Sequence, residues 1–137
     1  MKTLCLSIQI IAAGIGGGLG WFLGGFDGFL NALIAVVIVD YITGVMCAIV
    51  EKQLSSKVGT NGIFKKILIF MLVGIAHIVD YYLIQSGNAI RTAIIFFYIA
   101  NEGISILENT AAIGLPVPEK LRNILQLLKD RSSQNDN

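Results

Sequence analysis

The chain contains four long apolar stretches, and each is long enough to cross a lipid bilayer as a single helix. The acidic or imidazole side chains that interrupt these stretches are Asp40, His77, Asp80 and Glu102. A charge near the bilayer centre costs at least ~2.5 kcal/mol and persists mainly where it faces protein or water. Since 55% of the residues are apolar and only 14% are charged, we expect an all-α integral membrane protein with a polar interior.

Hydropathy predicts spanning helices at about 4–25, 28–50, 67–85 and 90–107. Their continuous apolar runs lack the alternation that the strands of a membrane barrel require, so helices are the expected spanning elements. The four helices make up a predicted transmembrane domain over residues 1–115. Within this domain a basic cytoplasmic linker, 51–66, joins the second helix to the third.

Basic residues lie unevenly on the two sides of this topology. Nine of the ten Lys and Arg fall on the side of the linker and the C-terminal tail, and only Arg91 falls on the other. Cytoplasmic segments carry such an excess, so we predict that both termini are cytoplasmic. Alternatively, the first stretch is a cleaved signal peptide, since Lys2 precedes an apolar run with small residues at Ala12 and Ala13. The apolar run continues well past those residues, which favours a spanning helix.

The later three helices each carry a polar edge. In the fourth, polar residues recur along one stripe at about 100° per residue, while Ile95, Phe96, Ile99 and Ile106 are predicted to face lipid. Two interpretations of Asp40 stay open: a structural partner for a cation or hydroxyl on a neighbouring helix, or a residue that hydrates a pore after assembly. The predicted pore-lining or polar-interface residues are Asp40, His77, Asp80, Tyr98, Asn101, Glu102, Ser105 and Asn109.

Glycine recurs every fourth residue in the first stretch. Gly16, Gly20 and Gly24 are predicted to form a glycine zipper, a smooth surface that lets a second helix approach closely. The competing interpretation is a flexible segment, since glycine lowers helix propensity by roughly 1 kcal/mol relative to alanine. The partner of the zipper is open: it is either the second helix of the same chain or the first helix of another copy.

Several classes of function are not supported. A net charge of +1 with few basic residues does not provide a nucleic-acid-binding face. Neither a nucleophile elbow nor an H-E-x-x-H motif occurs, so the chain is not expected to be an enzyme. Cys5 and Cys47 lie in apolar segments as small hydrophobic residues, and we expect neither a metal nor a cofactor.

The C-terminal segment 116–137 is predicted to be cytoplasmic. After Pro118, residues 119–129 form an amphipathic helix with Leu121, Ile124, Leu125 and Leu128 on one side. This helix is expected either on the membrane surface or against the linker. Residues 132–137 are predicted to be a solvated tail.

Four motifs point to a family. They are Asp40-Tyr41-Ile42-Thr43-Gly44, then Ser55-Ser56-Lys57-Val58-Gly59 followed by Gly62-Ile63, then Arg91-Thr92-Ala93 with Tyr98 through Asn109, and finally Gly114 through Leu121. With these motifs the chain resembles the toxin-secretion/phage-lysis holins over roughly residues 36–130. Members of that family are often described with three spanning helices, whereas hydropathy predicts four here.

The resemblance implies a protein that accumulates in the bacterial cytoplasmic membrane, assembles into homo-oligomers and opens lesions for an endolysin or a toxin. Its expected partners are further copies of itself, membrane lipids and the exported cargo. Two alternatives remain open at the level of sequence. One is a small ion channel or four-helix transporter whose carboxylates bind a cation, and the other is an inhibitory antiholin-type partner of another holin.

Overall fold

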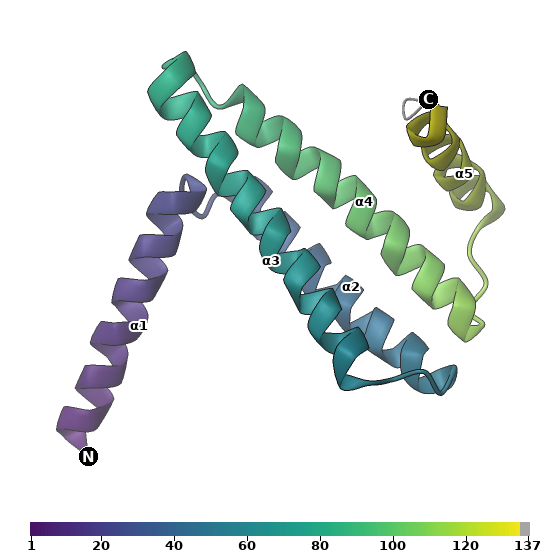
Figure 1. The fold of residues 1–137 in the computed structure, drawn as a ribbon, viewed down its shortest axis with the longest axis horizontal. Coiled ribbons are helices and arrows are strands. Elements are labelled where there is room, and N and C mark those ends of the chain that lie inside the picture. Colours follow the sequence, from purple (N-terminus) through teal and green to yellow (C-terminus); the bar gives the residue numbers. More distant parts are fainter. Residues whose placement is uncertain (135–137) are drawn as a thin grey trace.

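The computed structural model describes residues 1–134, and all regular secondary structure among them is helical (Figure 1). The elements are α1 (Lys2–Leu23), α2 (Gly28–Val50), α3 (Ser56–Ile78), the π-helical turn η1 (Val79–Ile84), α4 (Ala89–Ile113) and α5 (Glu119–Gln134). Four helical segments are long and apolar enough to cross a membrane, with α3 and η1 forming one of them. The predicted all-α membrane fold with a short C-terminal helix is thus confirmed.

The turn between α1 and α2 is defined by local stop and start signals. Gly24 adopts the left-handed conformation (φ 86°), and the Gly25 N–H donates to the Gly20 carbonyl over 2.7 Å. This pattern is a common glycine-dependent helix end. The Asp27 carboxylate then accepts a hydrogen bond from the Leu30 N–H at 2.9 Å and caps α2. Gly24 therefore ends α1 and does not continue a zipper along it.

The third helix begins earlier than hydropathy predicts. The Ser55 hydroxyl caps it by accepting from the Val58 N–H, so α3 starts at Ser56 rather than near residue 67. The predicted basic linker 51–66 is therefore largely helical. From Ser56 to Ile84 the segment has 29 residues and is roughly 43 Å long, more than the ~30 Å hydrocarbon core. Hydropathy detected the apolar part of this helix and missed its polar first turns.

The fourth helix is also longer than predicted. It runs over 25 residues from Ala89 to Ile113, beyond the predicted end at residue 107, and stops where Gly114 takes φ 111°. Pro116 and Pro118 follow within four residues and do not permit the helix to continue.

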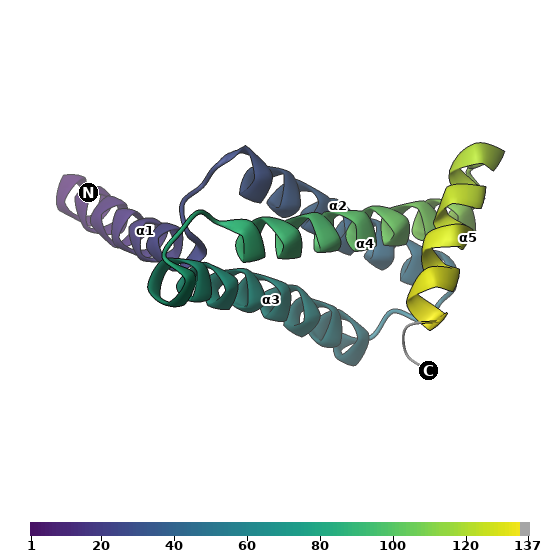
Figure 2. The same cartoon turned by 90° about the horizontal axis from the view of Figure 1, so that it is seen from above.

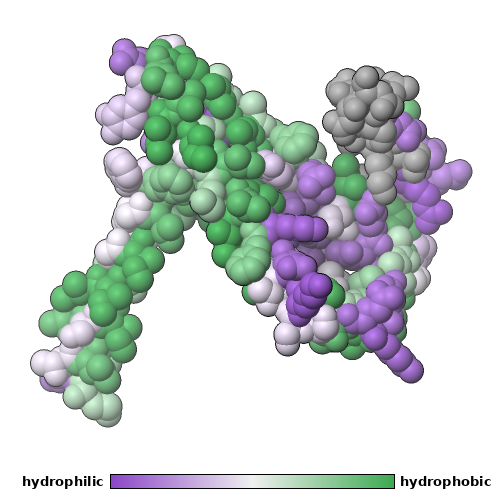
Figure 3. All heavy atoms as spheres, in the orientation of Figure 1, coloured by the Kyte–Doolittle hydropathy of each residue, from purple (hydrophilic) through white to green (hydrophobic). Residues whose placement is uncertain are grey.

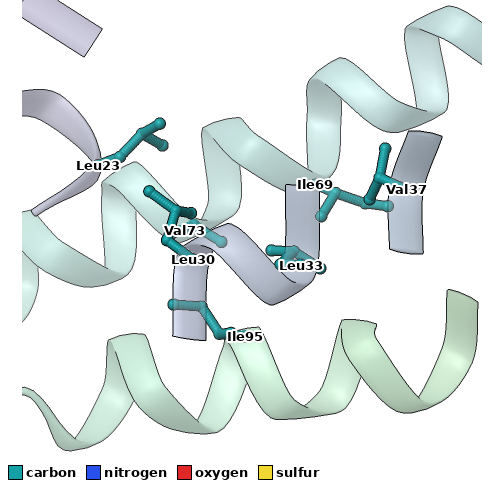
Figure 4. Packing of buried hydrophobic residues seen from close by; sticks show 7 residues of the cluster. All are labelled: Leu23, Leu30, Leu33, Val37, Ile69, Val73 and Ile95. Carbon is teal, nitrogen blue, oxygen red and sulfur yellow. The ribbon is translucent and has the colours of Figure 1, made fainter. Parts of the chain in front are cut away.

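Helices α2, α3 and α4 form a bundle around one apolar core. The most extensive contact is between α2 and α4. Toward the 51–55 connection α3 separates from the other two helices (Figure 2). The core lies nearer the opposite end, where side chains from the end of α1 and from the three bundle helices interdigitate (Figure 4). Its fully or nearly fully buried members are Leu23, Leu30, Leu33, Val37, Ile69, Val73 and Ile95.

Helix α1 leaves this bundle at an angle (Figure 1). It contacts α3 through its last turns only, and Leu23 is its one buried residue. The Phe22 ring lies against Gly74 of α3, where the ring occupies the space that a Cβ would need. In the space-filling view apolar atoms cover most of α1, whereas polar atoms gather around the 51–55 connection and α5 (Figure 3).

Helix α5 stands apart from the bundle (Figure 1), with Leu121 and Ile124 exposed. The side chains of Leu125 and Leu128, which the sequence assigns to the same apolar side, lie outside the described part of the structure. The helix continues to Gln134, so residues 132–134 are helical rather than part of the predicted tail. Residues 135–137 lie outside the described range.

Candidate functional site

The first polar cluster, here called the Lys66 triad, consists of Lys66, Asp40 and Glu102. The Lys66 ammonium of α3 donates to both carboxylates, Asp40 of α2 and Glu102 of α4. The side chains of Asp40 and Glu102 are 6% and 5% exposed, and that of Lys66 is 18% exposed. The three charged groups are therefore largely buried inside the bundle. One lysine therefore ties all three bundle helices together.

A second layer of hydrogen bonds orients Asp40 within the triad. The Asn109 amide of α4 donates to Asp40 Oδ1 at 3.2 Å and to the Thr43 hydroxyl at 3.1 Å. Thr43 in turn donates to the backbone carbonyl of Val39. Buried carboxylates are stable only when their lone pairs are satisfied in this way.

A cavity of about 210 Å³ opens beside the triad, where α3 separates from α2 and α4. Its polar lining comes from Asp40, Lys66, Ser105 and Asn109. Small residues on α2 and α3, Gly44 and Gly62 among them, provide the space. Each of these four polar side chains already has a partner within the site, and Ser105 is hydrogen-bonded to Asp40.

The second polar cluster, here called the Arg91 knot, lies at the opposite end of the bundle. Arg91 is 1% exposed, and its guanidinium donates to the carbonyls of Leu23 (2.6 Å) and Gly25 (2.8 Å) and to the Asp27 carboxylate (2.7 Å). These bonds attach the α1–α2 turn to the start of α4. The hydrogen bonds from Arg91 hold the pKa of Asp27 below its ordinary value.

Asp80 of η1 completes the Arg91 knot by capping α4. Its two carboxylate oxygens accept from the backbone N–H groups of Ile90 (3.2 Å) and Arg91 (2.8 Å), and the residue is 1% exposed. The first N–H groups of a helix have no partner inside the helix and carry partial positive charge, so a carboxylate is well suited there. The role of Asp80 in this structure is to cap a helix.

The predicted polar residues therefore divide into groups. Asp40, Glu102, Ser105 and Asn109 come together at the triad and its cavity, and Asp80 belongs to the Arg91 knot. The structure places His77 half-buried beside Tyr81, with ring centroids 6.0 Å apart, and packs Tyr98 against the core. Asn101 is exposed on the outer side of α4 and joins neither cluster.

The predicted lipid face of α4 is partly wrong. Ile95 is fully buried in the core and Ile99 packs against it, whereas Phe96 is 51% exposed. The bundle wraps around α4 on two sides, so a polar stripe and an apolar stripe of this helix both face protein. A single-helix pattern does not reveal this, because apolar side chains suit the core and lipid equally.

The three predicted zipper glycines have three different surroundings. No atom lies within 4 Å of the position that a Cβ would take on Gly16. At Gly20 that position lies 3.0 Å from the ring of Phe26, a residue of the same chain. Gly24 lies against His77 and Arg91 at the helix end. Of the two partners considered for the zipper, the second helix of the same chain is not the one contacted, since α1 packs on α3.

Sequence reasoning missed Lys66 and Asp27. Lys66 was assigned to the linker, yet it shares a face of α3 with Ile69 and Val73 at spacings of three and seven residues, and both of these are buried. That spacing was the available signal for an inward-facing lysine. Among the described residues, no group of three or more His, Cys, Asp or Glu side chains is placed to hold a metal ion.

Comparisons with known proteins agree with one another. The model of the bacteriophage holin family matches residues 17–130. A protein of Listeria monocytogenes described as uncharacterized is 41% identical over 123 residues, 90% of this chain and 87% of the relative. A second uncharacterized relative, from Clostridium perfringens, is 38% identical over 133 residues, 97% of this chain and 98% of the relative. A "probable holin" of Bacillus phage phi105 is 36% identical over 107 residues, 77% of this chain and 78% of that protein. No solved structure matches the chain significantly.

Proposed function

Because this chain belongs to the bacteriophage holin family, we propose that it self-assembles in the bacterial cytoplasmic membrane and opens lesions that release an endolysin to the cell wall. The family consists of non-enzymatic membrane proteins. The observation that carries the proposal is the family match over residues 17–130 in a chain with four candidate membrane spans. The relative described as a probable holin supports the same assignment.

The two polar clusters support a protein that enters lipid as a stable monomer before it assembles. The Lys66 triad and the Arg91 knot pair the buried charges within one chain. Unpaired charges would oppose insertion, whereas paired and hydrogen-bonded ones permit the chain to accumulate in the bilayer. Lesions then require contacts between copies, and among the four candidate spans α1 is the one least buried against its own chain.

The proposed topology has both termini in the cytoplasm. Four antiparallel spans place the N-terminus, the 51–55 connection and the start of α5 on one side, together with Lys2, Lys52 and Lys57. This is the side that carries the excess of basic residues. The exposed apolar side chains Leu121 and Ile124 of α5 then face the cytoplasmic leaflet, where an amphipathic helix is stabilised.

The cargo of the lesions belongs to the same proposal. The motifs of α2 and α4 resemble those of holins found beside toxin genes, so we extend the proposed cargo from endolysin to a secreted toxin. A selective cation channel is less favoured by the geometry, because the Lys66 ammonium and the Asn109 amide already engage the carboxylates of Asp40 and Glu102.

The decisive experiment is expression of the full chain in a bacterium with and without a cytosolic endolysin. We expect an abrupt loss of membrane potential at a threshold of expression, and culture lysis only when the endolysin is present. Endolysin expressed alone is the control. A gradual leak of small ions without endolysin release would contradict the proposal and favour a channel. If the chain causes no lysis itself but delays the lysis caused by a second, co-expressed holin, it acts as an antiholin.

A further inference from the structure

Helix α1 carries a face that no described residue of its own chain covers. On a helix of 3.6 residues per turn, Cys5, Gln9, Ala13 and Gly16 fall on one side. All except Gly16 are exposed, and Gly16 has no atom within 4 Å of its Cβ position. The small residues on this face leave the helix backbone accessible to close approach.

The side-chain amide of Gln9 is the reason why this face requires a protein partner. It lies seven residues from Lys2, about 10 Å along a helix of roughly 33 Å, and so within the hydrocarbon depth. The Ser7 hydroxyl is satisfied by the Thr3 carbonyl of the same helix, but in the described part of the chain the Gln9 amide has no hydrogen-bond partner. Acyl chains offer neither donor nor acceptor, so a lone amide at this depth is unfavourable until a protein group satisfies it.

The bundle of the same chain is not in a position to satisfy Gln9. Arg91 fixes the end of α1 through the carbonyls of Leu23 and Gly25, and Phe22 is seated on Gly74. These contacts set the direction in which α1 leaves the bundle, and its N-terminal half lies away from α2, α3 and α4 (Figures 1 and 2). A return of Gln9 to the bundle would break the Arg91 knot.

A second copy of this chain is suited to the position. Glutamine both donates and accepts, so two Gln9 side chains satisfy each other across a two-fold axis. Copies inserted with one topology present α1 in the same direction, which brings Gln9 opposite Gln9. We propose that α1 of one copy packs in parallel against α1 of a second copy through Cys5, Gln9, Ala13 and Gly16, with the two Gln9 amides hydrogen-bonded to each other. The inference deepens the proposed self-assembly and rests on it.

The native cysteine on this face provides the test. In lipid vesicles containing the full-length Cys47→Ser variant, Cys5 is the sole cysteine, and mild oxidation with copper phenanthroline should yield a disulfide-linked dimer. The Cys5→Ser variant, which keeps Cys47, should stay monomeric. If dimers formed only by random collision, their yield would fall in proportion to the dilution of the protein by added lipid. The yield would also be the same for all variants of α1.

Two matched glycine substitutions distinguish a contact through this face from a general effect of substitutions in α1. Gly16→Leu should abolish the Cys5 cross-link, whereas Gly14→Leu should leave it unchanged. Gly14 lies on the opposite side of α1, and neither glycine has an atom within 4 Å of its Cβ position, so neither change disturbs the monomer. Gln9→Leu should weaken association about three- to thirtyfold, as expected for the loss of one interhelical hydrogen bond in a membrane, and Gln9→Asn should retain it.

Release of a fluorescently labelled protein from the lumen of the same vesicles is measured in parallel. If the vesicles release cargo but Cys5 does not cross-link, or Gly16→Leu cross-links as well as Gly14→Leu, the α1 interface is wrong while the proposed function stands. Cross-linking that follows the predicted pattern in vesicles that retain all cargo would instead leave the interface in place and contradict the lesion-forming function.

Discussion

The Lys66 triad holds two carboxylates with one ammonium, and this imbalance decides how its members respond to substitution. Removing Lys66 leaves Asp40 and Glu102 without a counter-charge in a buried site. Removing the charge of Glu102 leaves a one-to-one pair of Asp40 and Lys66. The same cluster should therefore be sensitive at its cation and tolerant at one of its anions.

Lys66→Met is expected to destabilise the protein by about 3–5 kcal/mol, the cost of breaking a buried ion pair from one side. Glu102→Gln should change stability by only about 1 kcal/mol, since a hydrogen bond to Lys66 and a balanced pair remain. Thermal unfolding in detergent, followed by circular dichroism, measures both. In the Lys66→Met background, the additional substitutions Asp40→Asn and Glu102→Gln should restore much of the lost stability. Equal destabilisation by the two single substitutions would contradict this account of the triad.

The pair of Asp27 and Arg91 gives a dependence on pH. The pKa of Asp27 is lowered from 3.8 by the hydrogen bonds from Arg91. A carboxyl whose folded-state pKa is lowered contributes stability above its unfolded pKa and loses it as the pH falls through the folded value.

Asp27→Asn keeps the cap on α2, because asparagine is also a favoured N-cap, but it removes the charge. We expect a loss of about 1 kcal/mol between pH 5 and 7, modest because the Asp27 side chain is 40% exposed. The difference between the two proteins should close as the pH falls below about 4. Unfolding in detergent at several pH values measures this, and a difference that grows toward low pH would contradict the assignment.

At the scale of elements, the attachment of α1 depends on one glycine. A Cβ at Gly74 would enter the space of the Phe22 ring, so Gly74→Ala should displace the ring and destabilise the α1–α3 contact by about 1–3 kcal/mol. In a Phe22→Ala background the same substitution should have almost no effect. Gly103→Ala is the control, since no atom lies within 4 Å of its Cβ position. A double-mutant cycle of unfolding free energies tests this, and additive effects would contradict the contact.

The elements that sequence predicted well are those whose signal is local. The length and hydropathy of four apolar runs sufficed for the four spans. The start of α3 at Ser56 was missed, because polar turns outside the hydrocarbon carry no hydropathy signal. The pairing of Lys66 with residues 26 and 36 positions away was missed because it depends on how three helices cross. The α4 stripe, by contrast, predicted that Glu102, Ser105 and Asn109 share one side.

At the scale of the whole molecule, the proposed orientation is open to a direct measurement. In a background with Cys5 and Cys47 replaced by serine, a membrane-impermeant thiol reagent applied to intact cells should label Ser86→Cys in the turn before α4. It should miss Gln53→Cys in the connection before α3. Both positions are exposed, and Gln53 is preferable to Ser55, whose hydroxyl caps α3. Labelling of Gln53→Cys but not of Ser86→Cys would show that the topology is the reverse of the proposed one.

Assembly at this scale requires more than one kind of contact. A two-fold contact between α1 helices is complete once two copies have met, so a larger lesion requires a further surface on each copy. The outer side of α4, where Asn101 is exposed away from both polar clusters, is available for that role. The bundle thus buries Asp40, Asp80, Arg91 and Glu102, while the amides of Gln9 and Asn101 are exposed.

The single ammonium shared by two carboxylates also bears on biogenesis. Asp40 leaves the ribosome 26 residues before Lys66, and at about 5–20 residues per second the nascent chain carries an uncompensated acid for roughly one to five seconds. Partitioning of α2 into the bilayer becomes more favourable once α3 has been synthesised, so we expect the translocon to release these two helices as a hairpin. Glu102 arrives another 36 residues after Lys66 and joins a lysine that already pairs with Asp40.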